Sequence, residues 1–596
     1  MPIFTRTDRL RLRRKVRRQQ KQANTQIQRA GEHFEEHFIG RLDSVVDARR
    51  FIATWLFLAV LMVGITLIQS LNLSALYQKA TPAQGGIYTE GMVGTYSGAN
   101  PIFATGAVDS SVSKLLFAGL LTYDNNNQLV GDIAEGYTVD DSGRVYTLNL
   151  KQNVLWHDGI RLTADDVVFT YKLIQNPEVK SPKFTGWQGI EVSKIGDFTV
   201  QFVLKNALTS FPHGLTTGIL PEHIVGRIEP GALRASLFNT TQPVGAGPFK
   251  WNGLQLSSAT AVGSSTGIIS MVFNPSYFRD RPMLDGFNLH TYENEGQLLA
   301  AYEKKTINAV AGLKEVPESV EEDGVSDVHR FRTTASVMIF LKNEGILADA
   351  KVRSALNYAT NKQAIYEELS SDIVPVRSPI LRGQVGYNPA YVQPQQDIVK
   401  AQQLLDEAGW KMGADGVRSK DGLPLSFRLY AETSPANDYM LKALEKQWAN
   451  VGVDMMPVSQ ANTDFQVTLQ IHSYDALLHG ISIGADPDVY AYWHSSQADS
   501  RLQNRLNFSE YKSKVADEAL EAGRTRSDPA LRPLKYEPFL KAWVTDTPAI
   551  SLYEPKILYV TRGEIYGISD DRRLNTDVDR YNNVHEWATL KRQTTQ

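Results

Sequence analysis

The sequence predicts a mixed α/β protein with more than one lobe, preceded by one transmembrane helix. Three observations support this prediction. The chain has 596 residues, which is too long for a single compact core. Strand and helix patterns alternate from Gly85 onward. Residues 51–68 (FIATWLFLAVLMVGITLI) contain no charged side chain. With 42% hydrophobic and 21% charged residues, the chain is neither disordered nor fibrous.

The apolar run is long enough to cross a membrane. At 1.5 Å per residue, residues 51–68 nearly cross a hydrocarbon layer about 30 Å thick, and residues 69–71 complete the span. A buried core helix is seldom apolar on all sides with Arg49 and Arg50 at its edge. A cleaved signal peptide would need a charged region 50 residues long. We therefore expect an uncleaved transmembrane anchor at residues 51–71, followed by a linker at 72–84.

Charge predicts the orientation of this anchor. Residues 1–50 hold 13 Lys and Arg against 6 Asp and Glu, and nine of the basic residues lie between Arg6 and Lys21. Because basic flanks stay in the cytoplasm, residues 1–50 are expected to form a basic cytoplasmic tail that faces solvent or anionic lipid. The main domain is then extracytoplasmic, and the protein is a single-pass protein of the cell membrane.

The composition excludes several classes of function. After residue 71 the chain carries 49 basic and 59 acidic residues, so binding of this body to nucleic acid is not expected. The chain has no cysteine. This excludes disulfides, thiolate metal sites, cysteine nucleophiles and a lipid-modified N-terminal cysteine.

Local patterns predict individual elements after Gly85. Thr163 and Asp166 fit a capping box, and Asp349 is expected to open a helix that buries Val352, Ala355, Leu356 and Ala359. Alternation and helical spacing predict strands at 145–150, 198–204, 268–273 and 425–430, and helices at 397–408 and 437–450.

Two sequence motifs match catalytic signatures but lack the expected surroundings. His33-Phe-Glu-Glu-His37 fits a zinc-protease pattern, yet it lies in the polar tail without a packed domain around it. Gly263-Ser-Ser-Thr-Gly267 fits a nucleophile elbow, but a strand rather than a helix follows, so we expect a hairpin loop. The Gly245-Ala-Gly247 and Asp124-Asn-Asn-Asn127 segments are interpreted as turns. We expect no enzyme, no metal site and no cofactor.

Six ordered blocks resemble one known family. They are 116–166 (beginning LFAGLLTYD and ending LTADD), 244–249 (VGAGPF), 274–287 (NPSYFRDRPMLDGF), 349–361 (DAKVRSALNYATN), 401–409 (AQQLLDEAG) and 485–492 (ADPDVYAY). They resemble the family 5 extracellular solute-binding proteins, the peptide- and nickel-binding components of ABC importers. The resemblance implies a two-lobed periplasmic-binding-protein type II fold with an extra subdomain in lobe one. It places lobe one at 85–331 and 549–596, and lobe two at 332–548.

The chain departs from this family in ways that affect the ligand. Peptide-binding relatives hold the ligand amine with an aspartate four residues before a proline, but here that position before Pro487 is Ile483. Either Asp486 or Asp488 is a candidate replacement, although Asp486 could instead cap the following helix. Residues 431–435 contain no arginine, whereas dipeptide-binding relatives hold the ligand carboxylate with one there. This favours a longer peptide.

The resemblance and the residue types together nominate a ligand-binding set, each member of which could equally belong to the core or to a solvated loop. The predicted set is Tyr96, Trp187, Arg377, Glu432, His479, Ser482, Asp486, Asp488 and Tyr490.

The leading hypothesis is a membrane-anchored substrate-binding protein of an ABC importer, which captures oligopeptides by hinge closure and delivers them to permease subunits. One alternative is a receptor for a nickel chelate or another small solute, suggested by His479 and His494. A membrane-tethered ligand sensor is another alternative, and a hydrolase that uses Ser265 comes last.

Overall fold

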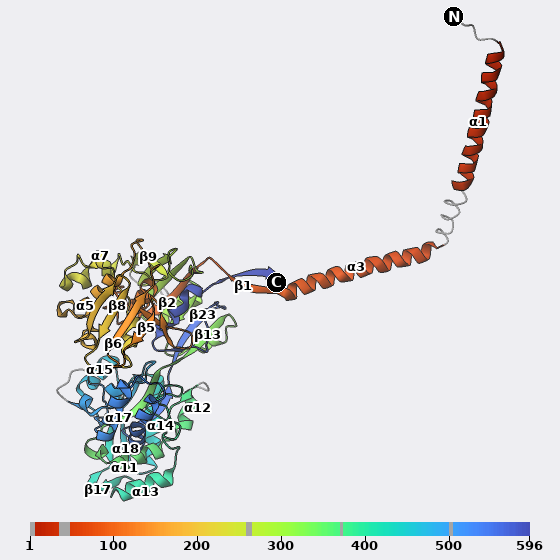
Figure 1. The fold of residues 1–596 in the computed structure, drawn as a ribbon. Helices are drawn as coiled ribbons and strands as arrows, with labels where there is room; N and C mark the ends of the chain where they lie inside the picture. The colour runs from red at the N-terminus through yellow and green to blue at the C-terminus, as the bar shows by residue number, and fades with distance from the viewer. Residues whose placement is uncertain (1–5, 35–47, 258–264, 370–372, 500–504, 596) are drawn as a thin grey trace. The chain divides into compact units, whose positions relative to one another are not determined.

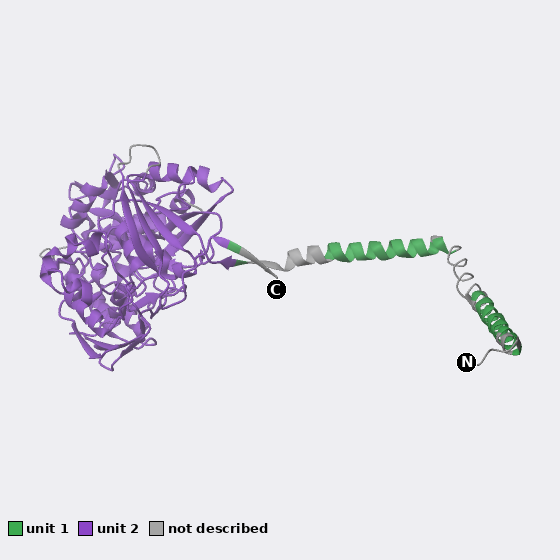
Figure 2. Ribbon diagram, turned by 90° about the horizontal axis from the view of Figure 1, so that it is seen from above, with its two compact units in different colours: residues 1–81, 591–596 green, residues 82–590 purple. Residues whose placement is uncertain are grey.

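A computed structural model describes residues 6–34, 48–257, 265–369, 373–499 and 505–595. The chain divides into two compact units, coloured separately in Figure 2. One comprises residues 1–81 and 591–596, and the other comprises residues 82–590.

The smaller unit contains two long helices, α1 (Arg6–Phe34) and α3 (Arg49–Tyr77). Within α3, the 19 residues Phe51–Gln69 are long and apolar enough to cross a membrane, and none of this stretch is buried inside the chain. Residues 72–84 were expected to form a linker, but α3 continues to Tyr77 and strand β1 (Gln78–Ala83) follows, pairing with β25 (Leu590–Thr595). No glycine or proline stands between residues 65 and 81, so no helix breaker separates the apolar stretch from residues 72–77.

The larger unit is built on two separate sheets, which define two lobes. The first lobe has an eight-stranded sheet in the order β24 (Arg573–Leu574), β13 (Ser326–Thr333), β23 (Lys556–Arg562), β12 (Ala309–Ala311), β2 (Ile87–Val93), β11 (Gly286–Tyr292), β10 (Gly267–Phe273) and β9 (Phe249–Leu256). The second lobe has a six-stranded sheet in the order β15 (Val374–Pro375), β22 (Ala549–Glu554), β14 (Ala335–Leu341), β21 (Ala476–Ser482), β19 (Ser426–Glu432) and β20 (Asp454–Gln460).

Helices cover both faces of the six-stranded sheet. Alternate residues of β14 point to opposite faces, as the pleat requires. Ile339 and Leu341 join the core under α11 (Ala350–Ala359), α13 (Ile398–Glu407) and α14 (Pro435–Ala449). Met338 and Phe340 join the core under α17 (Lys514–Thr525) and α18 (Arg532–Asp546). Figure 1 shows these helices gathered around this lobe, which is therefore a three-layer α/β/α structure.

The first lobe also carries a small antiparallel sheet in the order β5 (Ala134–Val139), β6 (Val145–Leu150), β8 (Thr199–Val203) and β7 (Glu191–Gly196). Helix α5 (Ala164–Ile174) packs on it, and the predicted capping box of Thr163 and Asp166 is confirmed. The resemblance implies an extra subdomain in this lobe, and this sheet is the candidate for it.

The chain crosses between the two lobes twice, each time at a single residue between two consecutive strands. It leaves the eight-stranded sheet between β13 and β14, at Thr334, and returns between β22 and β23, at Pro555. The return was expected at residue 549, but β22 pairs with β14 and so still belongs to the second lobe. Its apolar sequence (AISLY) gives no sign of which sheet it joins.

Several local predictions are confirmed. Asp349 and Asp397 are N-caps, and the four predicted apolar residues of α11 are fully buried. The α14 helix begins two residues earlier than predicted because Ser434 caps it. Strands β9 and β10 form an antiparallel hairpin, so Ser265 precedes a strand and not a helix, while Gly263 and Ser264 lie outside the described residues. Residues 35–37 of the histidine motif also lie outside them.

Candidate functional site

The ends of the strands show where the two lobes face each other. In the first lobe, β2, β11 and β12 are parallel, and β13 runs in the same direction because each of β12 and β13 is antiparallel to β23. The carboxyl ends of these strands therefore share one edge, and β13 leaves the lobe from it. In the second lobe, β14 enters at the edge where β19, β20, β21 and β22 have their carboxyl ends. Ligands in open α/β sheets bind at such edges.

Four of the seven predicted second-lobe residues lie between the end of β21 and the start of helix α16 (Tyr490–Trp493). Ser482 is the last residue of β21 and is exposed, and its carbonyl accepts a hydrogen bond from Tyr492 Oη at 2.8 Å. Ile483, at the position of the missing aspartate, is buried, and its N–H donates to the carbonyl of Thr334 at the crossing. The loop thereby continues the pairing of the sheet up to the point where the chain changes lobe.

Asp486 is already paired inside the second lobe. Its two carboxylate oxygens accept hydrogen bonds from Arg532 Nη1 and Nη2, both at 2.6 Å, and both side chains are less than one-tenth exposed. This carboxylate holds the pKa of Arg532 above its usual value, against the effect of burial. Such a bidentate pair is geometrically specific. Arg532 therefore neutralises the charge that a ligand amine would need.

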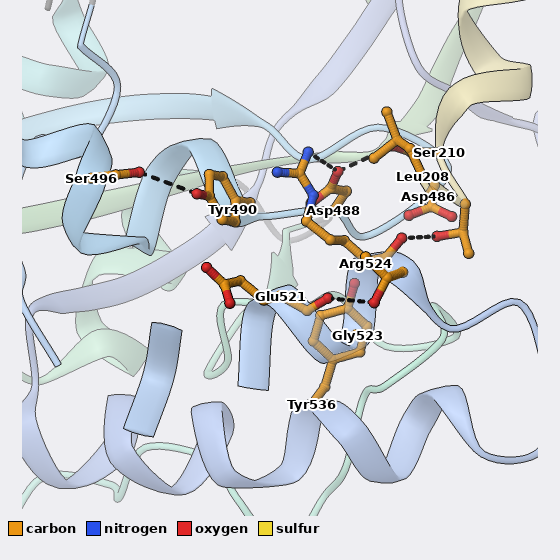
Figure 3. A network of polar contacts seen from close by, with 12 residues as sticks. Leu208, Ser210, Asp486, Asp488, Tyr490, Ser496, Glu521, Gly523, Arg524 and Tyr536 are labelled. Atoms are coloured by element: carbon orange, nitrogen blue, oxygen red, sulfur yellow. Dashed lines mark hydrogen bonds and ion pairs between the residues drawn. The ribbon is translucent and has the colours of Figure 1, made fainter. Parts of the chain in front are cut away.

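Asp488 joins the two lobes. Its Oδ2 accepts a hydrogen bond from Arg524 Nη2 at 2.9 Å and another from Ser210 Oγ, in the first lobe, at 3.1 Å (Figure 3). Next to this contact, the N–H and hydroxyl of Thr209 both donate to the carbonyl of Arg524, at 2.9 and 3.0 Å. We call these four residues the latch.

Tyr490 packs against the second-lobe side of the latch. Its ring stacks on His494 with centroids 4.0 Å apart, and the guanidinium carbon of Arg524 lies 4.1 Å from the centroid of the Tyr490 ring. Its hydroxyl contacts Ser496 Oγ at 3.2 Å, as Figure 3 shows. The aromatic face of Tyr490 is thus occupied by protein groups.

A second bridge between the lobes lies near the crossings. Lys314 follows β12, and Glu432 is the last residue of β19. The Nζ atom of Lys314 lies 3.9 Å from Oε1 of Glu432. A cavity of about 420 Å³ opens beside them. Residues from both lobes and from the return crossing line it, among them Lys314, Arg330, Ala436, Tyr553, Glu554 and Lys556. Its size falls within the range of small-molecule sites.

Tyr96 lies at the corresponding edge of the first lobe. It follows Gly94, whose φ of +136° lets the chain turn immediately after β2. Its ring stacks on Trp251 at 5.8 Å and its hydroxyl donates to the carbonyl of Asn239 at 3.4 Å. Burial raises the pKa of Tyr96, so it stays a neutral hydrogen-bonding group.

The other three predicted residues lie away from these edges: Trp187, His479 and Arg377. Trp187 is 6% exposed and packs on Tyr171 in the core of the subdomain. His479 lies between the rings of Phe465 and Phe508, and burial lowers its pKa to about 4. 

Arg377 donates through Nε to the carbonyl of Gln393 at 2.6 Å. Burial, assisted by Arg377, lowers the pKa of the neighbouring Lys362 to about 7. The nine predicted residues therefore do not form one cluster in this structure, and their roles in binding stay a prediction.

Sequence reasoning missed the residues that pair with the candidates. Arg524 and Arg532 come from α17 and α18, while Ser210 and Lys314 come from the first lobe. An arginine in the last turn of an amphipathic helix is common at a helix C-terminus, so nothing in the sequence distinguished Arg524. Only the packing of the helices against the 483–490 loop reveals these partners.

Two lobes joined by two crossings, with strand ends facing each other, define a two-lobed binding protein of the periplasmic-binding-protein kind. Residues 128–501 match the family "Bacterial extracellular solute-binding proteins, family 5 Middle", and the chain belongs to this family. It is a family of binding proteins and not a family of enzymes.

Relatives and solved structures agree with this assignment. The oligopeptide-binding protein AppA of Bacillus subtilis is 27% identical over 522 residues, which cover 84% of this chain and 91% of AppA. The structure of that AppA with a nonapeptide matches with a TM-score of 0.67 at 26% identity, covering 86% of this chain and all of AppA. NikZ of Campylobacter jejuni with Ni(L-His) matches with a TM-score of 0.70 at 26% identity, covering 84% and 99% of the two chains.

Proposed function

We propose that this protein is a membrane-anchored, extracytoplasmic substrate-binding protein of an ABC importer, which captures oligopeptides by closure of its two lobes and presents them to a permease. The observation that carries the proposal is the set of direct contacts between the two lobes: Ser210 with Asp488, Thr209 with Arg524, and Lys314 with Glu432. A ligand held between these edges touches both lobes at once, so binding favours the closed state. The permease then distinguishes closed from open by shape.

The proposed anchor is α3. Its stretch Phe51–Gln69 can cross a bilayer, and Arg49 and Arg50 precede it on the side that the charge rule assigns to the cytoplasm. A helical anchor would keep the binding unit at the membrane surface without a lipid-modified cysteine, which the chain lacks. 

An oligopeptide is the proposed ligand class because of the relatives and of the charges at the edges. AppA of Bacillus subtilis carries the name oligopeptide-binding protein and was solved with a nonapeptide. In this chain Asp486 and Asp488 are each neutralised by an arginine, and residues 431–435 contain no arginine. A ligand recognised mainly through its backbone needs neither terminal charge, since extended peptides pair through main-chain groups.

The experiment is a thermal-shift titration of the full chain in detergent with peptides of graded length and mixed sequence. Sugars and free amino acids serve as ligand controls. A peptide at a hundred times its dissociation constant should stabilise the folded protein by about 2.7 kcal/mol. Stabilisation that rises with peptide length and then levels off supports the proposal. If no peptide raises the melting temperature, the peptide assignment fails while the family assignment stands.

A nickel chelate is a second candidate, favoured by the similarity to NikZ with Ni(L-His). Within the described parts of the chain, no group of three or more His, Asp or Glu side chains could hold a metal ion. His479 is enclosed by two phenylalanine rings and His494 stacks on Tyr490. A chelate would therefore have to bring its own metal ligands, and nickel–histidine added to the same titration tests this candidate.

A further inference from the structure

One strongly charged surface takes no part in the proposed binding function. Residues 10–29 of α1, which we call the basic segment, contain no acidic residue and form about 30 Å of helix. Eight cationic side chains lie on the segment, all of them exposed: Arg11, Arg13, Arg14, Lys15, Arg17, Arg18, Lys21 and Arg29.

No ion pair joins any of these eight cations to a side chain that the structure describes, whereas Arg524 and Arg532 of the larger unit are each paired with an aspartate. The acidic residues of α1, Asp8 and Glu32, lie outside the basic segment. An uncompensated run of this kind repels itself unless an anionic surface lies nearby. The segment is therefore built to meet negative charge from outside the described chain.

The basic segment also has an apolar side. Val16, Ala23 and Ile27 recur at spacings of seven and four, so they share one side of the helix. Val16 is 48% exposed and Ile27 is 69% exposed. A helix with cations over most of its circumference and a narrow apolar side suits the boundary between headgroups and acyl chains.

We propose that the basic segment binds anionic phospholipid headgroups on the face of the membrane from which α3 enters. Cations close to such a surface are each attracted to it, and eight of them together are enough for stable attachment. The apolar side would then dip below the phosphates while the cations contact them. The attachment would fix the anchor's position in the bilayer independently of ligand.

Two rival occupants are disfavoured by arguments from the chain itself. Only 14 residues separate the end of α1 from the start of α3, which limits the distance between them to about 50 Å. The inference rests on the proposed anchor. The anchor would keep lipid headgroups at a high effective concentration around the basic segment, whereas a free polyanion such as RNA is not tethered near it. A second copy of α1 would bring eight further positive charges into contact, which repel.

The test uses the full chain, whose lack of cysteine permits single labels. An environment-sensitive fluorophore is attached at Ile27→Cys on the apolar side, or at Thr25→Cys on the opposite side as a matched control. Each protein is reconstituted into nanodiscs of phosphatidylcholine alone or mixed with phosphatidylglycerol, with a quencher attached to lipid. We expect several-fold stronger quenching at position 27 in the anionic discs than in the neutral discs, and much weaker quenching at position 25.

Charge dependence separates the outcomes. The change at position 27 should vanish at high salt, and also when Arg13, Arg14, Arg17 and Arg18 are all replaced by glutamine. Equal quenching in both kinds of disc would overturn the proposal, as would complete displacement by RNA or a signal that requires two copies in one disc. Co-elution of the protein with neutral discs tests the anchor separately. If the protein is recovered with anionic discs only, lipid binding by the basic segment is supported and insertion of α3 as an anchor is overturned.

Discussion

Ser210 Oγ in the first lobe and Asp488 Oδ2 in the second lobe are 3.1 Å apart, and the same carboxylate oxygen also accepts from Arg524. This hydrogen bond joins residues 278 positions apart in the chain. Because Arg524 supplies the charge balance within its own lobe, Asp488 would stay neutralised if the proposed opening of the lobes broke the bond from Ser210. This bond is therefore suited to set the balance between open and closed forms.

Replacement of Ser210 by alanine should shift the unliganded protein towards the open form. A hydrogen bond to a charged group contributes about 1.5–3 kcal/mol. Because this bond is partly exposed to solvent, we expect a value near the lower end of that range. Single-molecule energy transfer between dyes at Asp141→Cys and Lys512→Cys measures the two populations. Ser142→Ala is the matched control, since Ser142 Oγ also donates to a carboxylate, Asp140, but within one turn. Equal populations in both variants would show that the latch does not govern closure.

Acetylation of a peptide's N-terminus should change its affinity by less than about threefold, which is below about 0.7 kcal/mol. The reason is that Arg532 occupies both oxygens of Asp486, and Arg524 and Ser210 occupy Asp488. Isothermal titration with a free and an acetylated peptide of the same sequence measures the difference. A loss of affinity of about a hundredfold or more would instead mean that a ligand amine displaces one of the arginines.

The Glu90→Gln variant should lose much of its stability. Glu90 is fully buried on β2, where Arg580 Nη2 donates to it at 2.7 Å and the hydroxyls of Tyr559 and Tyr581 also bond to it. Removing one charge leaves Arg580 buried without its counter-charge, which typically costs about 3–5 kcal/mol. Urea denaturation measures the change. 

The control for this variant is Glu321→Gln, which breaks a half-exposed pair with Arg330. Surface pairs contribute about 0–1 kcal/mol, so this variant should unfold almost as the unchanged protein does. Comparable losses in both variants would contradict a special role for the buried pair.

His157 should make the protein less stable in mild acid. Its Nδ1 accepts from the N–H of Gly245 at 3.1 Å and its Nε2 donates to the carbonyl of Gly247 at 3.2 Å, and burial lowers its pKa to about 4. Between pH 6.5 and pH 4 the unfolded chain binds a proton at this site that the folded chain does not. Stability therefore falls as the pH falls through that window, by at most about 3 kcal/mol for this residue.

Melting temperatures between pH 4 and pH 7 for the unchanged protein and for His157→Gln test this prediction. The glutamine variant should start lower at pH 7, because its fit against the two glycines is poorer, but should lose less on acidification. Parallel curves would assign the acid sensitivity to other buried histidines, such as His479, whose pKa is also lowered to about 4.

The proposed topology predicts one-sided labelling in intact cells. A cysteine at Lys512, exposed on the second lobe, should react with a membrane-impermeant maleimide, while a cysteine at Gln20, exposed on α1, should react only after the cells are opened. The unchanged, cysteine-free chain gives the background. Labelling of Gln20→Cys in intact cells would mean that the anchor has the opposite orientation or that α3 does not cross the membrane.

The features that the sequence predicted well depend on neighbouring residues. The apolar stretch of α3, the capping box at Thr163, the N-caps at Asp349 and Asp397 and the hairpin before β10 are all short-range patterns. The family resemblance rests likewise on local blocks, and the two-lobe fold follows from them. The structure differs from the expected boundaries in two places, the extension of α3 to Tyr77 and the return crossing at Pro555.

The sequence by itself determined the α/β class, the apolar helix, the family and the kind of molecule that the family comprises, because periodicity, capping and ordered motifs are written in consecutive residues. The tertiary structure alone decided which side chains meet. Asp486 meets Arg532 across 46 residues, and Asp488 meets Ser210 across 278. Such pairs depend on how helices pack on the sheets and how the chain crosses between lobes. Burial and geometry, which no local pattern encodes, thus decided which of the candidate carboxylates are already neutralised.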